Sequence, residues 1–222
     1  MATSRIAIVG GADPNRKDYD PEVHVEDAKL MAVAIGAEFA KRGHSIIVYH
    51  SGAAFIEEDV VTGFVNAHPR AERSIIVRQP QMGSLATFPE EKTHSELFQR
   101  LADTSDLWEV SFYRSLVDSD GVALIGGGYS TFNAGQVAIG ARIPILALEK
   151  SGGAASKVWK TLSPGVDLPT SDEHARMAQP LSEGVVTSWI DAIDAQRRRR
   201  YAVETGPIKS HALRGCLETK PL

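Results

Sequence analysis

The sequence predicts an α/β fold, a doubly wound parallel sheet of about five or more strands with helices on both faces. Two observations predict it. Five short apolar segments alternate along the chain with longer segments of helical periodicity. Glycine-rich turns follow several of the apolar segments, where the strands of a parallel sheet would end. Ligands in such sheets bind beyond the carboxyl ends of the strands, so these turns are the first candidates for a binding site.

The expected strands are rich in aliphatic residues, and the expected helices carry apolar residues at spacings of three and four. The strands span residues 5–9, 45–49, 74–77, 121–125 and 143–148. The helices span residues 23–42, 57–67, 107–117, 131–141, 153–162 and 181–200. Residues 79–93 are rich in proline, glycine and glutamine and are expected to form a long loop, which in a compact domain is usually functional or mobile.

The composition predicts one globular domain. We expect a domain of residues 1–200 and a tail of residues 201–222, which lacks periodicity and is expected to be extended or disordered. The net charge of -4 offers no electrostatic footprint for nucleic acid or an anionic membrane. Cys216 is the single cysteine and the histidines are scattered, so we expect neither an intrachain disulfide nor a metal site.

The sequence also predicts where the protein resides. Its first residues are typical of a strand rather than a signal peptide. No apolar stretch approaches the roughly 20 residues needed to cross a bilayer. We therefore expect a cytoplasmic protein.

The strongest candidate site is a glycine-rich turn that follows the apolar segment 121–125. Three consecutive glycines let the chain turn sharply and let a ligand approach the backbone closely. The helix that follows would direct free N–H groups at an anion, and two hydroxyl side chains could add donors. The alternative is a tight turn capped by one hydroxyl, but three glycines after a central strand favour a ligand site. The residues are Gly126, Gly127, Gly128, Ser130 and Thr131.

Two further glycine pairs are expected to line the same cleft. Gly10 and Gly11 end the first strand and could form a second phosphate wall or only terminate the strand. They do not belong to a dinucleotide fingerprint, because no third glycine follows at the required spacing. Gly152 and Gly153 follow the last strand and precede a helix, a position that also favours anions.

Charged residues on the helix 107–117 are the candidates for chemistry. Glu109 could stabilise an oxocarbenium-like transition state, and Arg114 could hold a phosphate. The alternative is an ion pair at the surface, which would contribute little. Glu57, Glu58 and Asp59 are interpreted as helix-capping residues rather than catalytic ones.

Four segments together resemble a known superfamily. They are residues 55–61, 108–116, 126–131 and 152–155, and the resemblance covers most of residues 5–162. The sequence resembles the LOG (lysine decarboxylase-like) group of the SLOG superfamily. It is most similar to the STALD branch, which occurs beside sirtuin-type and TIR domains in bacterial defence proteins. The resemblance implies a Rossmann-like fold and a nucleotide-derived ligand.

The resemblance also shows where this chain departs from the LOG enzymes, which hydrolyse the N-glycosidic bond of nucleoside monophosphates. Their signature is Pro-Gly-Gly-x-Gly-Thr-x-x-Glu. Here Gly126 stands for the proline, Ser130 for the second invariant glycine and Ala134 for the glutamate. The phosphate cradle is thus retained while the hydrolytic carboxylate is lost, and the transition state lacks its stabilising charge.

The resemblance therefore favours binding over turnover. The expected ligand is an adenine nucleotide of the ADP-ribose, cyclic ADP-ribose or NAD type, bound without a further cofactor by a sensor or regulatory module of antiphage defence. The expected partners are a second copy of the chain, as in LOG-like homo-oligomers, and an effector domain or protein. The alternative is an N-glycosidase or deoxyribosyltransferase-like enzyme that uses Glu109 and Arg114, and a scaffold with a vestigial pocket is a third possibility.

Overall fold

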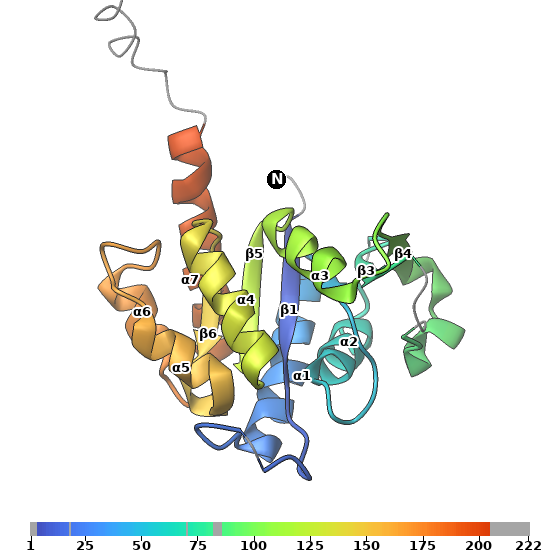
Figure 1. Ribbon diagram of the computed structural model, residues 1–222, viewed down its shortest axis with the longest axis horizontal. Coiled ribbons are helices and arrows are strands. Elements are labelled where there is room, and N and C mark those ends of the chain that lie inside the picture. Colours follow the sequence, from blue (N-terminus) through green and yellow to red (C-terminus); the bar gives the residue numbers. More distant parts are fainter. Residues whose placement is uncertain (1–3, 18, 70, 82–85, 205–222) are drawn as a thin grey trace, which may run out of the picture.

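The chain folds around one parallel sheet, which is visible in Figure 1. The computed structural model describes residues 4–17, 19–69, 71–81 and 86–204. Within these residues, the sheet has six strands in the order β4-β3-β2-β1-β5-β6, and every neighbouring pair is parallel. The strands are β1 (Arg5–Gly11), β2 (Ser45–Val48), β3 (Ile75–Gln79), β4 (Phe98–Ala102), β5 (Gly121–Gly126) and β6 (Ile145–Leu148).

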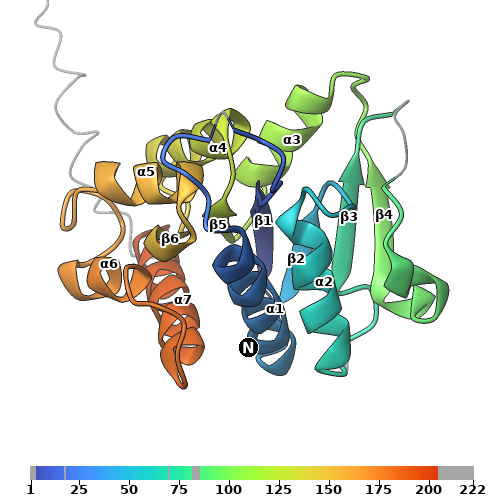
Figure 2. The same cartoon turned by 90° about the horizontal axis from the view of Figure 1, so that it is seen from below.

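Helices cover both faces of the sheet, as Figures 1 and 2 show together. One face carries α3 (Trp108–Val117), α4 (Tyr129–Gly140) and α5 (Gly153–Thr161). The other face carries α1 (Val25–Lys41), α2 (Ile56–Asn66) and α7 (Val185–Glu204). The predicted doubly wound α/β, Rossmann-like fold is therefore confirmed.

The strand order places the expected binding edge between β1 and β5. The chain winds from β1 through β2 and β3 to β4, and then returns to place β5 on the other side of β1. Because the connections leave β1 and β5 in opposite directions, their carboxyl ends open a crevice. The register pairs Gly10 with Ile125 and Gly11 with Gly126, so two of the predicted glycine turns are adjacent at this edge.

Strand β4 was not predicted from the sequence. Its residues Phe-Gln-Arg-Leu-Ala do not form an apolar run, because β4 is an edge strand that pairs only with β3. Phe98 packs near Phe88, while the half-buried Arg100 pairs with Glu91. The segment expected to be a long loop contains the last residue of β3 and the 3-10 turn Pro89–Lys92; residues 82–85 lie outside the described residues.

Two C-terminal elements differ from expectation. Helix α6 (Ser171–Met177) was missed although Thr170 and Glu173 form a capping box, a motif that the sequence displays. Helix α7 begins at Val185 and extends to Glu204, past the expected end at residue 200. The rest of the predicted tail, residues 205–222, lies outside the described residues.

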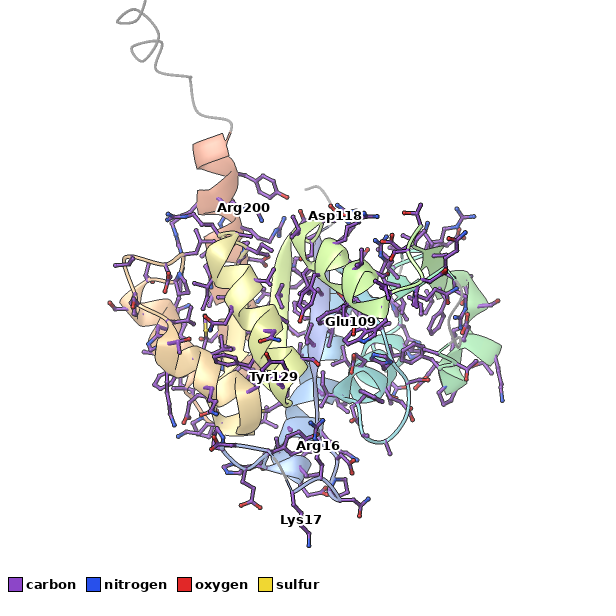
Figure 3. The ribbon with its side chains drawn as sticks, viewed as in Figure 1. Arg16, Lys17, Glu109, Asp118, Tyr129 and Arg200 are labelled. Atoms are coloured by element: carbon purple, nitrogen blue, oxygen red, sulfur yellow. The ribbon has the colours of Figure 1, made fainter. Side chains whose placement is uncertain are left out.

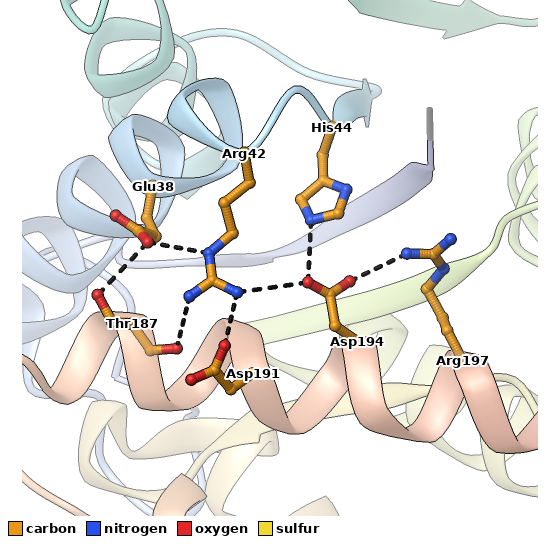
Figure 4. Close-up of polar contacts among 7 residues, drawn as sticks. All are labelled: Glu38, Arg42, His44, Thr187, Asp191, Asp194 and Arg197. Carbon is orange, nitrogen blue, oxygen red and sulfur yellow. Dashed lines mark hydrogen bonds and ion pairs between the residues drawn. The ribbon is translucent and has the colours of Figure 1, made fainter. Parts of the chain in front are cut away.

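Hydrogen bonds and ion pairs connect α7 to α1 through the cluster of polar side chains in Figure 4. Arg42 contacts Asp191 at 2.7 Å and Asp194 at 3.4 Å. Asp194 also contacts His44 at 3.4 Å and Arg197 at 3.0 Å. Burial by itself raises the pKa of Asp194, but the His44 hydrogen bond and the nearby positive charges outweigh it and lower this pKa. The other members are Glu38 and Thr187.

The same helix covers the edge of the sheet at β6. The buried Gln196 side chain accepts the N–H of Ile145 and donates to its C=O, both at 2.9 Å. One amide side chain therefore takes the place of a neighbouring strand. This pairing satisfies backbone groups that an edge strand would otherwise leave open.

Candidate functional site

A cavity of about 300 Å³ opens at the carboxyl edge of the sheet, at the crevice between β1 and β5. Its walls come from the ends of β1, the loop from β1 to α1, the segment after β2, the first turns of α2 and α4, and one face of α3. The cavity therefore lies where the strand order predicts a ligand site.

Most of the sequence-predicted binding residues lie in this wall. Gly126, Gly152 and Gly153 do not line the cavity and lie behind it instead. There the N–H of Ala154 donates to the C=O of Gly127 at 2.8 Å, so the start of α5 supports the glycine turn. The predicted residues in the wall are Gly10, Gly11, Gly127, Gly128, Ser130 and Thr131.

Two backbone amides expected to bind an anion are already used inside the protein. The N–H of Gly126 donates to the hydroxyl of Ser151 at 2.8 Å, and the N–H of Gly127 donates to the C=O of Gly11 at 2.8 Å. These bonds fix the turn but remove both amides from ligand binding. The first two glycines therefore shape the site rather than contact an anion through their N–H groups.

The open amides lie at the beginning of α4. Among the described residues, no acceptor pairs with the N–H groups of Gly128, Tyr129, Ser130 and Thr131, and Gly128 offers no side-chain cap. The first intrahelical bond runs from the N–H of Phe132 to the C=O of Gly128 at 3.0 Å. An uncapped helix start that borders a cavity carries partial positive charge and favours an anion.

Arg16 adds a full positive charge beside these amides. A Cβ built on Gly128 would lie 3.2 Å from the Arg16 Nη2 atom, so the guanidinium packs against the glycine. The same guanidinium lies over the Tyr19 ring, 5.0 Å from its centre. In Figure 3, Arg16 and Tyr129 lie at one end of the molecule, away from Asp118 and Arg200. Sequence reasoning missed Arg16, because only the tertiary fold brings this loop to α4.

Gly127 is required by the geometry of the turn. Its φ is +77°, and a Cβ there would lie 2.1 Å from the Thr131 Oγ1 atom. Any side chain would therefore strain the backbone and displace the buried Thr131 hydroxyl. By contrast, Ala134 is fully buried in the core rather than exposed to the cavity.

Glu57 is a second functional candidate that sequence reasoning missed. Its side chain lies in the cavity wall, the residue is only 3% exposed, and its Oε2 atom has no hydrogen-bond partner among the described residues. Burial raises the pKa of Glu57 to about 8, so the carboxyl is predominantly neutral at pH 7. From the sequence, Glu57 is interpreted as a helix-capping residue of α2. Its position in the first turn of the helix that follows β2, near the edge where parallel sheets bind ligands, is the signal that could have identified it.

Aromatic side chains surround the Glu57 side of the cavity. His50 stacks on Phe55 with ring centres 4.7 Å apart and meets Trp108 edge-on at 5.8 Å. Trp108 packs in turn on Phe112 at 5.0 Å. Burial lowers the pKa of His50, which favours its neutral form. This wall suits a planar, uncharged ring.

Glu109 and Arg114 do not line the cavity, although both lie on α3 as expected. Both are exposed, and Figure 3 labels Glu109 beside α3. Arg114 pairs with the buried Asp103 at 2.8 Å, and Arg78 approaches the same carboxylate at 3.5 Å. A catalytic role for Glu109 stays a prediction.

A second cavity of about 590 Å³ adjoins the first. The two share Gly128 and Tyr129, and Tyr129 is 77% exposed between them. Lys157 and Lys160 line the second cavity, and Lys157 forms an ion pair with Asp20 at 2.7 Å. The open amides of α4 therefore lie between two recesses.

The described residues show no group of side chains that could hold a metal ion. In the same part of the chain, no helix combines the length and apolar character needed to cross a membrane.

Comparison with known proteins establishes the fold. No protein-family model matches the chain, and no curated protein matches it. Among solved structures, the protein TM1055 is 19% identical with a TM-score of 0.58, covering 86% of this chain and 99% of that one. The Moco carrier protein of Chlamydomonas reinhardtii is 17% identical with a TM-score of 0.56, covering 89% and 99%. A second structure of that carrier is 15% identical with a TM-score of 0.54, covering 88% and 98%.

Identities this low show a shared fold and no shared activity. The resemblance to the LOG group and to its STALD branch stays a prediction. The chain has the Rossmann-like fold of these proteins.

Proposed function

We propose that the protein binds a nucleotide-derived small molecule, with a phosphate on the open amides of α4. The observation that carries this proposal is the uncapped helix start at Gly128–Thr131, which borders the cavity beside the Arg16 guanidinium. Backbone donors and a fixed positive charge at one point are suited to phosphate oxygens. The unpartnered Oε2 atom of Glu57 in the same wall supports a ligand that makes polar contacts at both ends.

The adjoining cavity favours a ligand with two halves. A molecule held by its phosphate at Gly128 can extend past the exposed Tyr129 ring toward Lys157 and Lys160. A second phosphate would meet the positive charge of Lys160 there, while Lys157 is paired with Asp20. We therefore favour ADP-ribose, cyclic ADP-ribose or NAD-type molecules over a mononucleotide.

The protein would then act as a sensor or regulatory module. In that role, the bound molecule changes the activity of an effector domain or protein, in the manner of antiphage defence modules. The carrier protein with the same fold is named for another small molecule, Moco, which supports ligand binding as a role for this architecture. A second copy of the chain remains the expected partner.

Calorimetry with ADP-ribose, cyclic ADP-ribose, NAD and AMP tests this proposal. At least one of these is expected to bind, and Arg16→Gln is expected to weaken that binding about tenfold or more, because hydrogen bonds to charged groups contribute about 1.5–3 kcal/mol. Arg198→Gln is the matched control, since Arg198 is exposed and lies outside both cavities. Absence of binding across the panel, or equal binding by both variants, would contradict the proposal.

Hydrolysis of an N-glycosidic bond is the second candidate. The observation that favours it is the protonated Glu57 carboxyl in the cavity wall, since a carboxylic acid can donate a proton to a leaving base. Release of free base from nucleotides, followed by chromatography, tests this function. Loss of base release in Glu109→Gln would support Glu109 as the catalytic residue, as the sequence predicts. Loss of base release only in Glu57→Gln would instead assign the catalytic role to Glu57 in the cavity wall.

A further inference from the structure

The phosphate end and the Glu57 end of the cavity lie on opposite sides of β1. The open amides of α4 follow β5, while Glu57 lies in the first turn of α2, after β2. Because β1 lies between β2 and β5 in the sheet, a ligand held at both places must cross the end of β1. Gly10 and Gly11 form that end and line the cavity, where they present backbone without a side chain.

The surroundings of Glu57 show which part of the ligand it meets. Phe55, Trp108 and Phe112 line the cavity on this side, and the neutral His50 stacks among them. Aromatic faces bind planar rings by stacking, as they do in proteins that bind single-stranded nucleic acids. A nucleobase fits this end better than a second phosphate, which the buried carboxyl would not favour.

The protonation of Glu57 narrows the choice of base. A neutral carboxyl offers one O–H donor and one C=O acceptor, whereas a carboxylate only accepts. Adenine presents a ring nitrogen acceptor beside an exocyclic amine donor, which complements the neutral acid. The Watson–Crick edge of guanine presents two adjacent N–H donors, which complement the ionised form.

We propose that the Glu57 end is a base-binding subsite, in which Glu57 selects a ring nitrogen flanked by an exocyclic amine, as on adenine. The inference rests on the proposed function, because the phosphate at α4 fixes the direction of the ligand. Glu57 donates its proton to the ring nitrogen and accepts from the amine. Binding therefore requires the protonated form and weakens as the carboxyl ionises.

Other titratable groups face the same space. Burial raises the pKa of Tyr49, which lies beside Glu57, and lowers that of His50. Those shifts move the pKa values of both groups away from the range in which Glu57 ionises. The variant Glu57→Gln then shows whether a pH dependence of binding comes from Glu57. The remaining groups lining the cavity are Asp13, Arg16, Tyr19 and Tyr129, and Arg78 lies near Tyr49.

The experiment measures the dissociation constants of AMP and GMP from pH 7 to 9.5 at constant ionic strength, a range in which the phosphate group is already doubly ionised. Wild-type protein is expected to bind AMP at least tenfold more tightly than GMP at pH 7. Its affinity for AMP is expected to fall about tenfold per pH unit above pH 8, and thus about 30-fold by pH 9.5.

Glu57→Gln tests whether Glu57 causes this fall in affinity. The glutamine keeps one donor and one acceptor, so the variant is expected to bind AMP within about threefold of wild type at pH 7, with an affinity that does not fall as pH rises. Glu183→Gln, an exposed change of the same type, keeps the slope.

Three results would overturn the inference. They are a constant affinity of wild type for AMP across this pH range, an affinity that rises with pH, and an equal or better affinity for GMP at pH 7. Binding of ribose 5-phosphate, which has no base, shows whether the base-binding subsite or the phosphate site has failed. If ribose 5-phosphate binds wild type and is lost in Arg16→Gln while AMP shows no pH slope, the phosphate site stands and the base-binding subsite does not.

Discussion

The Ser151 hydroxyl accepts the backbone N–H of Gly126 at 2.8 Å, which ties the end of β5 to the turn before α5. The same hydroxyl donates to the C=O of Leu148 at 2.6 Å, and Ser151 is fully buried. A single side chain thus fixes the position of the glycine turn relative to β6. The open amides of α4 begin two residues farther along, so their direction depends on this bond.

Substituting Ser151 tests that dependence. Ser151→Ala would leave the Gly126 N–H buried without an acceptor, which costs about 1–3 kcal/mol of the free energy of unfolding. Urea denaturation measures the loss, and calorimetry with the best-binding nucleotide is expected to show weaker binding. Ser182→Ala, at an exposed position, is the control. An unchanged free energy of unfolding in Ser151→Ala would show that the bond contributes nothing.

Glycines at the two ends of α4 should respond in opposite ways to alanine. Gly127→Ala places a Cβ 2.1 Å from Thr131 Oγ1 at a φ of +77°, so we expect a loss of stability and of nucleotide binding. Gly140→Ala meets no atom within 4 Å at the end of α4 and is expected to be neutral or stabilising by up to about 1 kcal/mol. Thermal unfolding and calorimetry of both variants measure the difference. Equal behaviour of the two would refute a special role for Gly127.

Glu57 should destabilise the free protein at neutral pH. Its pKa is about 8 in the folded state and about 4.5 in an unfolded chain, so folding takes up a proton between these values. The free energy of unfolding should therefore fall as pH rises from about 4.5 to about 8 and then level off. Glu57→Gln removes this dependence and is expected to be more stable than wild type by about 3 kcal/mol at pH 7.

Urea denaturation of both proteins at pH 5, 6, 7 and 8 measures the Glu57 effect. The advantage of Glu57→Gln over wild type should grow with pH across this series. A constant difference would show that Glu57 titrates normally in the folded protein, contrary to its burial.

The cluster between α1 and α7 should depend more on one aspartate than on the other. Asp194 is 14% exposed in its side chain and contacts Arg42, His44 and Arg197, whereas Asp191 is 51% exposed and contacts Arg42. We expect Asp194→Asn to lower the free energy of unfolding by about 1–2 kcal/mol and Asp191→Asn by less than about 0.5 kcal/mol. Denaturation at pH 7 measures both, and the reverse order would contradict the assignment.

The pH dependence of this cluster follows from the lowered pKa of Asp194. A carboxylate with a depressed pKa stabilises the fold above its ordinary pKa and loses that contribution as pH falls through the folded value. The difference between wild type and Asp194→Asn should therefore shrink in acid. A difference that grew as pH fell would contradict this sign.

The sequence by itself determined five of the strands and one wall of the cavity at the edge of the sheet. Strands β1 and β5 are continuous apolar runs because both faces of a central parallel strand are buried, and such runs can be recognised without a structure. The glycines that follow them mark places where the backbone must turn sharply or approach another segment. Strand β4 was not predicted because an edge strand needs fewer apolar side chains, so its residues do not form an apolar run.

Only the tertiary structure decided which groups line the cavity and keep unpaired donors or acceptors. Gly126 and Gly127 use their N–H groups on Ser151 and Gly11, which lie far away in sequence, so the free amides begin at Gly128. Arg16 and Glu57 enter the same cavity from two other connections of the sheet. A sequence displays the local conformations that its residues favour, whereas hydrogen-bond partners and the burial of a carboxyl arise from segments that meet only when the chain has folded.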